Sequence, residues 1–354
     1  MNEPTLAQRA TDLLQQLIAI PSFSREEEQT CRLLADFLTV QGVTVTVEGH
    51  NVWGLTANHD NSKPNVLLNS HHDTVKPNSG YSRDPFLPEI SSEGKLFGLG
   101  SNDAGGPLVS LLMTFLHFYD KRLPFNLIFA ATAEEEISGS GGVASILPSL
   151  PDITFGVVGE PTGMQMAIAE KGLIVIDCVS KGKAGHAARK NGLNAIELAL
   201  SDLQWLKEYE FEKQSETLGL VNMSVTQIQA GTQHNVIPDR CEFVIDVRTT
   251  DAYTNEEIVE IISERLVAEV KPRSVRLQPS GIALNHPARQ AAIDLGIPMY
   301  GSPTLSDQAL MRFPTIKMGP GESERSHTAD EYIYVKEIEE GIAGYIRFIE
   351  NLKL

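Results

Sequence analysis

The first fifty residues show, one after the other, the two hydrophobic periods of regular secondary structure. Residues 6–18 carry apolar side chains at intervals of three and four, which predicts an amphipathic helix that ends before Pro21. Ser24 and Glu27 match the two positions of a capping box, so a second helix is expected to begin there. Residues 43–47 then alternate valine with threonine, which predicts a half-buried strand.

Beyond that strand, the patterning predicts a large domain with a smaller one inserted into it. Apolar runs alternate with helical stretches up to about residue 170, which indicates an α/β domain with an open, mostly parallel sheet and flanking helices. The next elements follow the β-α-β-β-α-β order of a ferredoxin-like α+β unit. They are expected at residues 173–179, 192–209, 221–229, 241–248, 255–269 and 274–278. A closing helix is predicted at 335–351. The expected domains are therefore 1–171 with 283–354, and 172–282.

Four of the apolar strands end at residues that can bind a divalent metal or support one that does. The run 126–133 ends in Glu134-Glu135-Glu136, and the run 66–70 leads into His71-His72-Asp73. A third strand leads into Glu160, and the strand at 316–318 runs on towards His327. In open α/β sheets, ligands bind beyond the carboxyl ends of the strands. We therefore expect most of these side chains to share one rim of the sheet.

Asp103 adds a further carboxylate in the glycine-rich turn 98–103. Each of these residues alone has an ordinary explanation. Asp103 suits a turn or a helix N-cap, and the three glutamates suit the first turn of a helix. Glu160 could close a strand, and His327 could be a loop histidine. Together they form a His, Asp and Glu set whose chemistry suits a divalent metal.

Composition and charge exclude several other classes of protein. The chain has 354 residues, is 42% apolar and carries a formal net charge of −17. This charge argues against nucleic-acid binding, which needs a basic surface, and favours attraction of cations. Three cysteines (Cys31, Cys178 and Cys241) are expected to be reduced core residues. No signal-like segment or run of about 20 apolar residues is present, so we expect a cytoplasmic protein with no membrane partner.

Seven short stretches, taken together and in order, resemble the di-zinc hydrolase family that includes acetylornithine deacetylase, succinyl-diaminopimelate desuccinylase, aminoacylase and glutamate carboxypeptidase. The resemblance covers nearly the whole chain. The stretches are Ser70-His71-His72-Asp73-Thr74-Val75, Gly98 to Asp103, Thr132 to Glu136, Gly159-Glu160-Pro161-Thr162, Gly185-His186-Ala187, Asn235-Val236-Ile237-Pro238 and Gly319-Pro320-Gly321 to His327.

The resemblance implies a role for each candidate residue in the larger domain. His71 and Glu160 would hold one zinc ion, Glu136 and His327 would hold the second, and Asp103 would bridge the two. Asp73 would orient His71, and Glu135 would be the general base. The implied cofactor is two Zn²⁺ ions per chain, with Co²⁺ as the implied substitute.

The resemblance also implies that the inserted domain is a lid that forms a homodimer. His186 is similar to a histidine that reaches the partner's active site and stabilises the oxyanion. Asn235 and Arg248 match positions that contact the substrate's carboxylate. Considered without the resemblance, His186 and Asn235 would be loop hydrogen-bonding residues and Arg248 a surface charge.

Two features depart from the family pattern or leave an alternative open. After Asp103 the family often has Met-Lys-Gly-Gly, whereas this chain reads Ala104-Gly105-Gly106-Pro107 and lacks the lysine. The doubled histidine leaves His72 as an alternative ligand to His71.

The expected reaction is hydrolysis of the amide bond of a small N-acyl amino acid, with N-acetylornithine or N-succinylornithine as the favoured substrate in arginine biosynthesis. Succinyl-diaminopimelate, other lysine-pathway amides and short peptides are the alternatives.

The sequence also contains a local motif that is typical of a different class of enzyme. Residues 139–144 read Gly-Ser-Gly-Gly-Val-Ala and fit a dinucleotide-binding fingerprint, with Glu160 about 20 residues on. Three glutamates precede these glycines and would repel a pyrophosphate, which argues against an NAD-dependent oxidoreductase.

Overall fold

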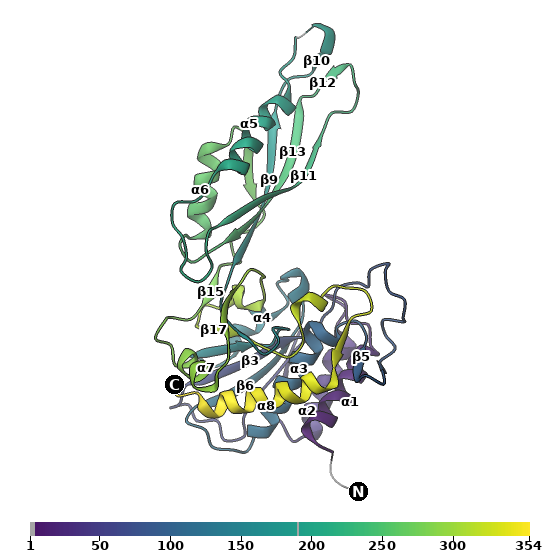
Figure 1. Cartoon of the computed structure of the whole chain (residues 1–354), viewed down its shortest axis with the longest axis vertical. Coiled ribbons are helices and arrows are strands. Elements are labelled where there is room, and N and C mark those ends of the chain that lie inside the picture. Colours follow the sequence, from purple (N-terminus) through teal and green to yellow (C-terminus); the bar gives the residue numbers. More distant parts are fainter. Residues whose placement is uncertain (1–3, 190) are drawn as a thin grey trace. The chain divides into compact units, whose positions relative to one another are not determined.

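The computed structural model describes residues 4–189 and 191–354, which form two compact units (Figure 1). The larger unit comprises Met1–Ile168, Gly281–Tyr300 and Ser306–Leu354. The smaller unit comprises Ala169–Ser280 and Gly301–Leu305. Relative to the expected domains, residues 169–171 and 301–305 belong to the smaller unit and residues 281–282 to the larger one.

A nine-stranded sheet forms the centre of the larger unit. Its strand order is β1-β2-β6-β3-β7-β17-β8-β15, and β16 also pairs with β8. The strands are β1 (Val45–Glu48), β2 (Asn51–Leu55), β3 (Asn65–His71), β6 (Asn126–Thr132), β7 (Phe155–Val158), β8 (Met166–Glu170), β15 (Ser280–Gly281), β16 (Met299–Ser302) and β17 (Thr315–Lys317). A second sheet of order β18-β5-β4 contains β4 (Glu89–Ile90), β5 (Lys95–Phe97) and β18 (Tyr332–Tyr334).

The middle of the large sheet is parallel. β3 pairs in parallel with β6 on one side and with β7 on the other, and β7 pairs in parallel with β17. All seven residues of β3 and all seven of β6 are buried, as expected for strands covered on both faces. The fold is thus a mostly parallel α/β sheet, and β2 and β8 add antiparallel pairs on its two sides.

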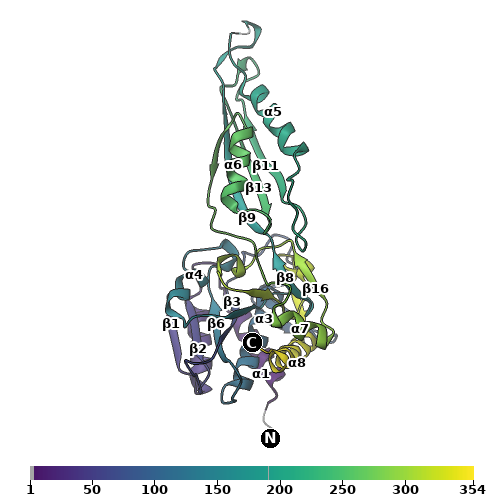
Figure 2. The ribbon, with the colours of Figure 1, turned by 90° about the vertical axis from the view of Figure 1, so that its left-hand side faces the viewer.

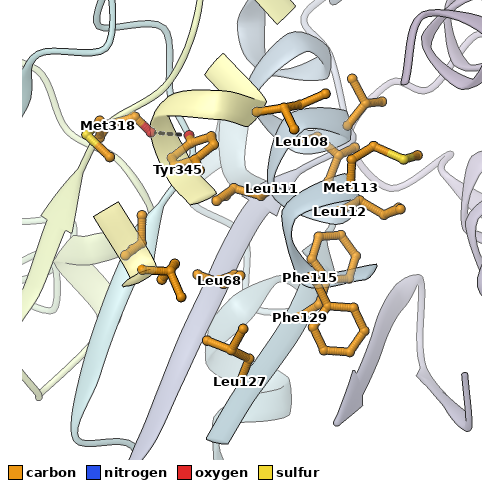
Figure 3. Close-up of a cluster of buried hydrophobic side chains, with 14 of the residues drawn as sticks. Leu68, Leu108, Leu111, Leu112, Met113, Phe115, Leu127, Phe129, Met318 and Tyr345 are labelled. Carbon is orange, nitrogen blue, oxygen red and sulfur yellow. Dashed lines mark hydrogen bonds between the residues drawn. The ribbon is translucent and has the colours of Figure 1, made fainter. Parts of the chain in front are cut away.

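Three long helices cover one face of this sheet: α1 (Leu6–Ile18), α3 (Gly106–Phe118) and α8 (Val335–Asn351). Figure 2 shows them together on one side of the strands, and they contact one another. α3 is apolar around most of its circumference and is buried along almost its whole length. Leu111 and Phe115 of α3 meet Phe129 of β6 in the main core, and the Tyr345 hydroxyl of α8 donates to the Met318 carbonyl (Figure 3).

The other face of the sheet has a smaller core. Val143 and Ile146 of the short helix α4 (Val143–Ile146) pack there with Leu67 and Ile128. The remaining helices of the larger unit are α2 (Glu28–Val40) and α7 (Pro287–Leu295).

The predicted capping box before α2 does not form. α2 begins at Glu28, and its N-cap residue Glu27 makes no side-chain cap hydrogen bond. The Ser24 hydroxyl instead donates to a carboxylate oxygen of Asp73 at 2.7 Å. The capping prediction was wrong because both side chains have partners from distant segments, which a local sequence pattern cannot show.

The smaller unit has the predicted β-α-β-β-α-β order. Its antiparallel sheet has the order β11-β13-β9-β14. Its elements are β9 (Gly172–Lys181), β10 (Gly185–His186), α5 (Ala195–Glu208), β11 (Asn222–Ala230), β12 (Val236–Ile237), β13 (Arg240–Thr249), α6 (Asn255–Arg265) and β14 (Glu269–Pro272). The last strand therefore lies at 269–272 rather than at the predicted 274–278, because α6 ends at Arg265, four residues earlier than expected.

Cys31, Cys178 and Cys241 are buried and free, as expected. Among the described residues, no helix combines the length and the apolar character needed to cross a bilayer.

Candidate metal centre

Three neighbouring strands of the large sheet end at the same edge, each beside a residue that can bind a metal. His71 is the last residue of β3, Glu135 and Glu136 begin the turn that follows β6, and Glu160 comes two residues after β7. β3 pairs in parallel with both β6 and β7, so the carboxyl ends of all three strands lie together. The strand pairing therefore brings these four residues to one rim.

Asp103 and His327 reach this rim from loops. Asp103 lies in the irregular turn Ser101–Gly105, directly before α3. His327 follows the short helical turn Ser323–Arg325 and has a φ of +59°. A non-glycine residue in this left-handed conformation costs of the order of 1 kcal/mol, so surrounding contacts must hold it. One such contact is a 3.2 Å hydrogen bond from the Asn78 side chain to the His327 carbonyl.

These residues form two groups that share Asp103. In the first group, His71 Nε2 lies 3.4 Å from Asp103 Oδ1 and 3.7 Å from Glu160 Oε1. In the second, His327 Nε2 lies 3.5 Å from Asp103 Oδ2 and 3.0 Å from Glu136 Oε2. Within each group, the candidate ligand atoms lie within 4.8 Å of one another. The two oxygens of Asp103 thus face different histidines.

Two observations indicate that the first group is suited to binding a divalent ion. Two ligand atoms that each lie 2.0–2.2 Å from a tetrahedral ion are about 3.4 Å apart, close to the observed spacings. His71 Nε2 and Glu160 Oε1 are also buried and, within the described part of the chain, have no hydrogen-bond partner. The other ring nitrogen of His71 lies 3.0 Å from the Asp73 carbonyl, which leaves the Nε2 lone pair facing the cluster.

The cluster contains more carboxylates than basic groups, and this crowding changes their pKa values. Burial raises the pKa of Glu135 well above its ordinary value, and the carboxylates of Glu160 and Glu136 raise it further. Burial and the Asp103 carboxylate raise the pKa of Glu160 to about 8. Burial alone would lower the pKa of His71, but the surrounding carboxylates raise it well above its usual value. Crowded carboxylates of this kind attract cations, and bound divalent ions would relieve their mutual repulsion.

Glu135 lies beside both groups without belonging to either. Its Oε2 is 3.8 Å from His71 Nε2, and its side chain is only 12% exposed. A carboxylate in this position can accept a proton from a water molecule held at the centre. This geometry suits a general base that is not itself a ligand.

Asp73 holds the turn that carries Glu135 and Glu136. One of its carboxylate oxygens accepts the Glu135 N–H at 3.0 Å, and the other accepts the Glu136 N–H at 3.2 Å. The hydrogen bond that His71 Nδ1 makes is to the Asp73 main-chain carbonyl, whereas the nearer carboxylate oxygen lies at 3.5 Å. Asp73 therefore contacts His71, as expected, and also positions the two glutamates.

Two other buried carboxylates, which the sequence analysis did not identify as site residues, hold the backbone of the site loops. The carboxylate of Glu27 accepts the N–H of Glu134, next to Glu135, at 3.2 Å. The carboxylate of Glu331 accepts three N–H groups from the loop that carries Asp103. The only sequence signal was position, because Glu27 lies just before a helix and Glu331 lies four residues after His327.

The structure decides between the two adjacent histidines. The ring nitrogens of His72 lie 2.9 Å from the Thr30 hydroxyl and 2.9 Å from the His50 carbonyl. Both nitrogens are therefore engaged away from the cluster, whereas His71 Nε2 faces it.

The glycines of the dinucleotide fingerprint surround a glutamate side chain. The Gly141 N–H donates to Glu134 Oε2 at 3.2 Å, and a Cβ atom at Gly139 would lie 1.9 Å from the same oxygen. The helix that follows, α4, has only four residues. The glycines are thus explained by close approach to Glu134, and the dinucleotide hypothesis is not supported.

The other three candidate residues lie in the smaller unit. His186 is exposed in β10, next to the loop that contains Asn235. Arg248, in β13, forms an ion pair with Asp246 at 2.8 Å. Asn235 directly precedes β12, on the amino-terminal side of β13, and Arg248 lies near the carboxyl end of β13, whose residues 240–248 span about 26 Å at 3.3 Å per residue. The smaller unit of one chain therefore cannot apply both side chains to one small carboxylate.

Comparison with known proteins agrees with this geometry. Residues 67–351 match the family described as peptidase family M20/M25/M40. The acetylornithine deacetylase of Proteus mirabilis is 29% identical over 97% of this chain and 96% of its own length. A protein named probable carboxypeptidase from Aspergillus flavus is 29% identical over 94% of this chain and 88% of its own length. A crystal structure of a dinuclear metal-binding M20 peptidase from Bacillus subtilis superposes with a TM-score of 0.75 at 17% identity and covers 98% of both chains.

Proposed function

Because this chain belongs to peptidase family M20/M25/M40, an enzyme family of metallopeptidases and amidohydrolases, we propose that it removes the acyl group from a small N-acyl amino acid, with N-acetylornithine or N-succinylornithine as its substrate. One observation carries the proposal: two groups of candidate ligands share Asp103, with Glu135 beside them. The similarity to acetylornithine deacetylases over nearly the full length supports hydrolysis of an acylated amino acid, and acyl-ornithine is the substrate that we propose within that class.

The proposed residue roles follow from the positions of the side chains. His71, Asp103 and Glu160 would hold one divalent ion, and Asp103, Glu136 and His327 would hold the other. Zinc suits this nitrogen and oxygen donor set, and cobalt is the expected substitute. When bound, such a pair of ions supplies Lewis acidity, which lowers the pKa of a bound water and polarises the substrate carbonyl.

Glu135 has the role of moving a proton. Its carboxylate takes the proton of the attacking water and returns it to the nitrogen of the departing amine, so the amide C–N bond breaks as a C–O bond forms. Burial and the neighbouring carboxylates raise the pKa of Glu135 above its ordinary value, which is consistent with this role. General acid–base help of this kind is typically worth about 10²–10⁴-fold in rate.

We also propose that the enzyme acts as a homodimer associated through the smaller unit. β11 is an edge strand of its sheet, and on it Val225 and Ile228 are 38% and 57% exposed. On the neighbouring helix α5, Ile196 and Leu200 are spaced by four residues and are 37% and 57% exposed. An unpaired strand edge beside an exposed apolar helix face is suited to pairing with a second copy.

A dimer would also explain how Asn235 and Arg248, which lie far apart within one smaller unit, can act on the same substrate. In the proposed assembly, His186 and Asn235 of one copy and Arg248 of the other contribute to the same active site. His186 would stabilise the developing oxyanion, and Asn235 and Arg248 would bind the substrate carboxylate.

Substrate hydrolysis tests the reaction. We expect acetylornithine or succinylornithine to be hydrolysed faster than succinyl-diaminopimelate or a dipeptide, and activity to be lost with EDTA and restored by Zn²⁺. If none of the acylated amino acids were hydrolysed in the presence of zinc, the proposal would be overturned. Faster hydrolysis of succinyl-diaminopimelate or of the dipeptide would keep the reaction class and replace the substrate.

Sedimentation velocity tests the dimer. Leu200→Glu should convert the dimer to monomer, because it places a charge in the proposed apolar interface. Val267→Glu is the matched control, since Val267 is also in the smaller unit, is 70% exposed and lies two residues before β14, the opposite edge strand. A Leu200→Glu protein that remained dimeric would refute this interface.

A further inference from the structure

Glu331 is a buried acid that the proposed reaction does not use directly. It directly precedes β18, is 2% exposed, and belongs to the segment that also carries His327. An acid this deeply buried is unfavourable unless hydrogen bonds or charges compensate it. Its contacts therefore indicate why it is there.

All three hydrogen bonds recorded for the Glu331 carboxylate come from the loop that carries Asp103. Oε1 accepts the N–H of Asn102 at 2.8 Å and the N–H of Asp103 at 2.9 Å, and Oε2 accepts the N–H of Gly100 at 3.1 Å. The Glu331 main-chain carbonyl accepts a fourth N–H, from Gly98, at 3.0 Å. One residue thus receives four backbone donors from six consecutive positions.

Asn102 ties the same loop to the His327 segment a second time. Its side-chain oxygen accepts the Glu322 N–H at 3.0 Å, and its side-chain nitrogen donates to the Glu322 carbonyl at 3.0 Å. The loop that carries Asp103 is therefore fastened on both sides of His327, at Glu322 and at Glu331.

We infer that Glu331 is a positioning residue that fixes Asp103 between the two candidate metal sites. This inference rests on the proposed function, in which Asp103 is the ligand shared by both ions. The two oxygens of Asp103 face His71 and His327 at 3.4 and 3.5 Å, so a small rotation of its backbone would lengthen one contact as it shortened the other. Three N–H groups held by one carboxylate oppose that rotation.

Glu331→Gln is the most direct test, because it keeps the shape of the side chain. The amide has a single oxygen, so it can keep the Asn102 and Asp103 donors but turns its NH₂ group towards the Gly100 N–H. It also removes an ionisable group, whose pKa burial and the Asp103 carboxylate raise to about 8. Changes of residues that orient metal ligands typically lower metal affinity about 10–100-fold, and we expect a loss in that range for both ions.

The neighbouring residue provides a matched control. Asp330 also accepts three hydrogen bonds, from the Ser82 N–H, the Ser82 hydroxyl and the Arg83 N–H, but from a loop that carries no candidate ligand. Asp330→Asn therefore perturbs the same number of hydrogen bonds one residue away, at a more exposed position. We expect it to change metal affinity less than 3-fold.

The experiment titrates metal-free full-length protein with Zn²⁺ against a chromophoric chelator, and records the visible absorption of the Co²⁺-loaded protein. Glu331→Gln should weaken binding about 10–100-fold and change the Co²⁺ spectrum, whereas Asp330→Asn should do neither. If Glu331→Gln does not fold, Glu331→Asp tests the same point, since it keeps the charge but draws the carboxylate back by one methylene.

The outcomes separate this inference from the proposed function. Two ions bound by the wild type, with unchanged affinities and spectrum in the Glu331 variant, would overturn the inference alone. A wild-type protein that bound no metal at all would overturn the proposed function and the inference with it. An equal loss of affinity in both variants would also count against a specific role for Glu331.

Discussion

Replacing Asp73 by asparagine should destabilise the larger unit, because it disrupts the hydrogen bonds that hold the Glu135–Glu136 turn. Asp73 is fully buried, and its two oxygens accept the N–H groups of Glu135 and Glu136. Its Oδ2 also accepts the Ser24 hydroxyl at 2.7 Å. An asparagine has one oxygen, so at least one of the two backbone N–H groups must face an NH₂ group.

The size of the effect follows from those contacts. A hydrogen bond to a charged group is worth about 1.5–3 kcal/mol, and solvent cannot replace the lost acceptor at a buried site. The Ser24 hydroxyl can rotate and accept from the new NH₂ group, so that bond is kept. We therefore expect a loss of about 2–3 kcal/mol in the unfolding free energy of the metal-free protein.

The two tryptophans of the chain make the measurement specific. Trp53 lies in β2 of the larger unit and Trp205 lies in α5 of the smaller one. In a Trp205→Phe background, urea unfolding followed by fluorescence reports the larger unit alone. Because the chain has two compact units, separate transitions are expected, and a single two-state fit to the whole chain would mislead.

Ser24→Ala is the matched control, since it removes only the hydroxyl that donates to Asp73. It should cost about 0.5–1.5 kcal/mol, the usual range for one hydrogen bond. If Asp73→Asn were no more destabilising than Ser24→Ala, Asp73 would not hold the turn as described, and its role would reduce to its contact with His71.

Three further predictions concern single side chains. Glu135→Gln should keep both metals and lose about 10²–10⁴-fold in kcat, so a near-normal rate under saturating zinc would show that another group is the base. His327→Ala should bind one metal instead of two by elemental analysis, and two per chain would refute its role as a ligand. His286 Nδ1 caps α7 by accepting the Ala288 N–H. Burial lowers the pKa of His286, so the folded state binds fewer protons than the unfolded state below about pH 6.5. Stability should therefore fall as the pH drops below that value, and His286→Asn should reduce this loss in urea titrations at pH 7.5 and 5. Equal losses in both proteins would contradict the cap.

Much of the fold could be predicted from the sequence because the deciding information is local. The closing helix was predicted at 335–351 and is observed as Val335–Asn351, since its apolar period and length are unambiguous. The apolar runs 66–70 and 126–133 correspond to β3 and β6, all of whose residues are buried. The short strand β14 was misplaced, because so short an exposed element has no clear period.

The candidate ligands could also be named from the sequence, because parallel strands bring their carboxyl ends to one edge whatever the details of packing. That rule places His71, Glu136 and Glu160 together once a parallel sheet is assumed. It says nothing about which of two adjacent histidines faces the cluster. In the structure His71 Nε2 faces the cluster, whereas the ring nitrogens of His72 contact the Thr30 hydroxyl and the His50 carbonyl.

The sequence by itself determined the order of the elements, the fold class and the chemical character of the centre, all of which depend on residue type and spacing. Only the tertiary structure decided what the buried acids do. Glu331 accepts N–H groups from residues 228 to 231 positions away, and Glu27 accepts one from Glu134, 107 positions away. A glutamate in a sequence is most often a solvated surface residue. Whether it is buried, and which backbone donors compensate its charge, depends on segments that meet only when the chain has folded.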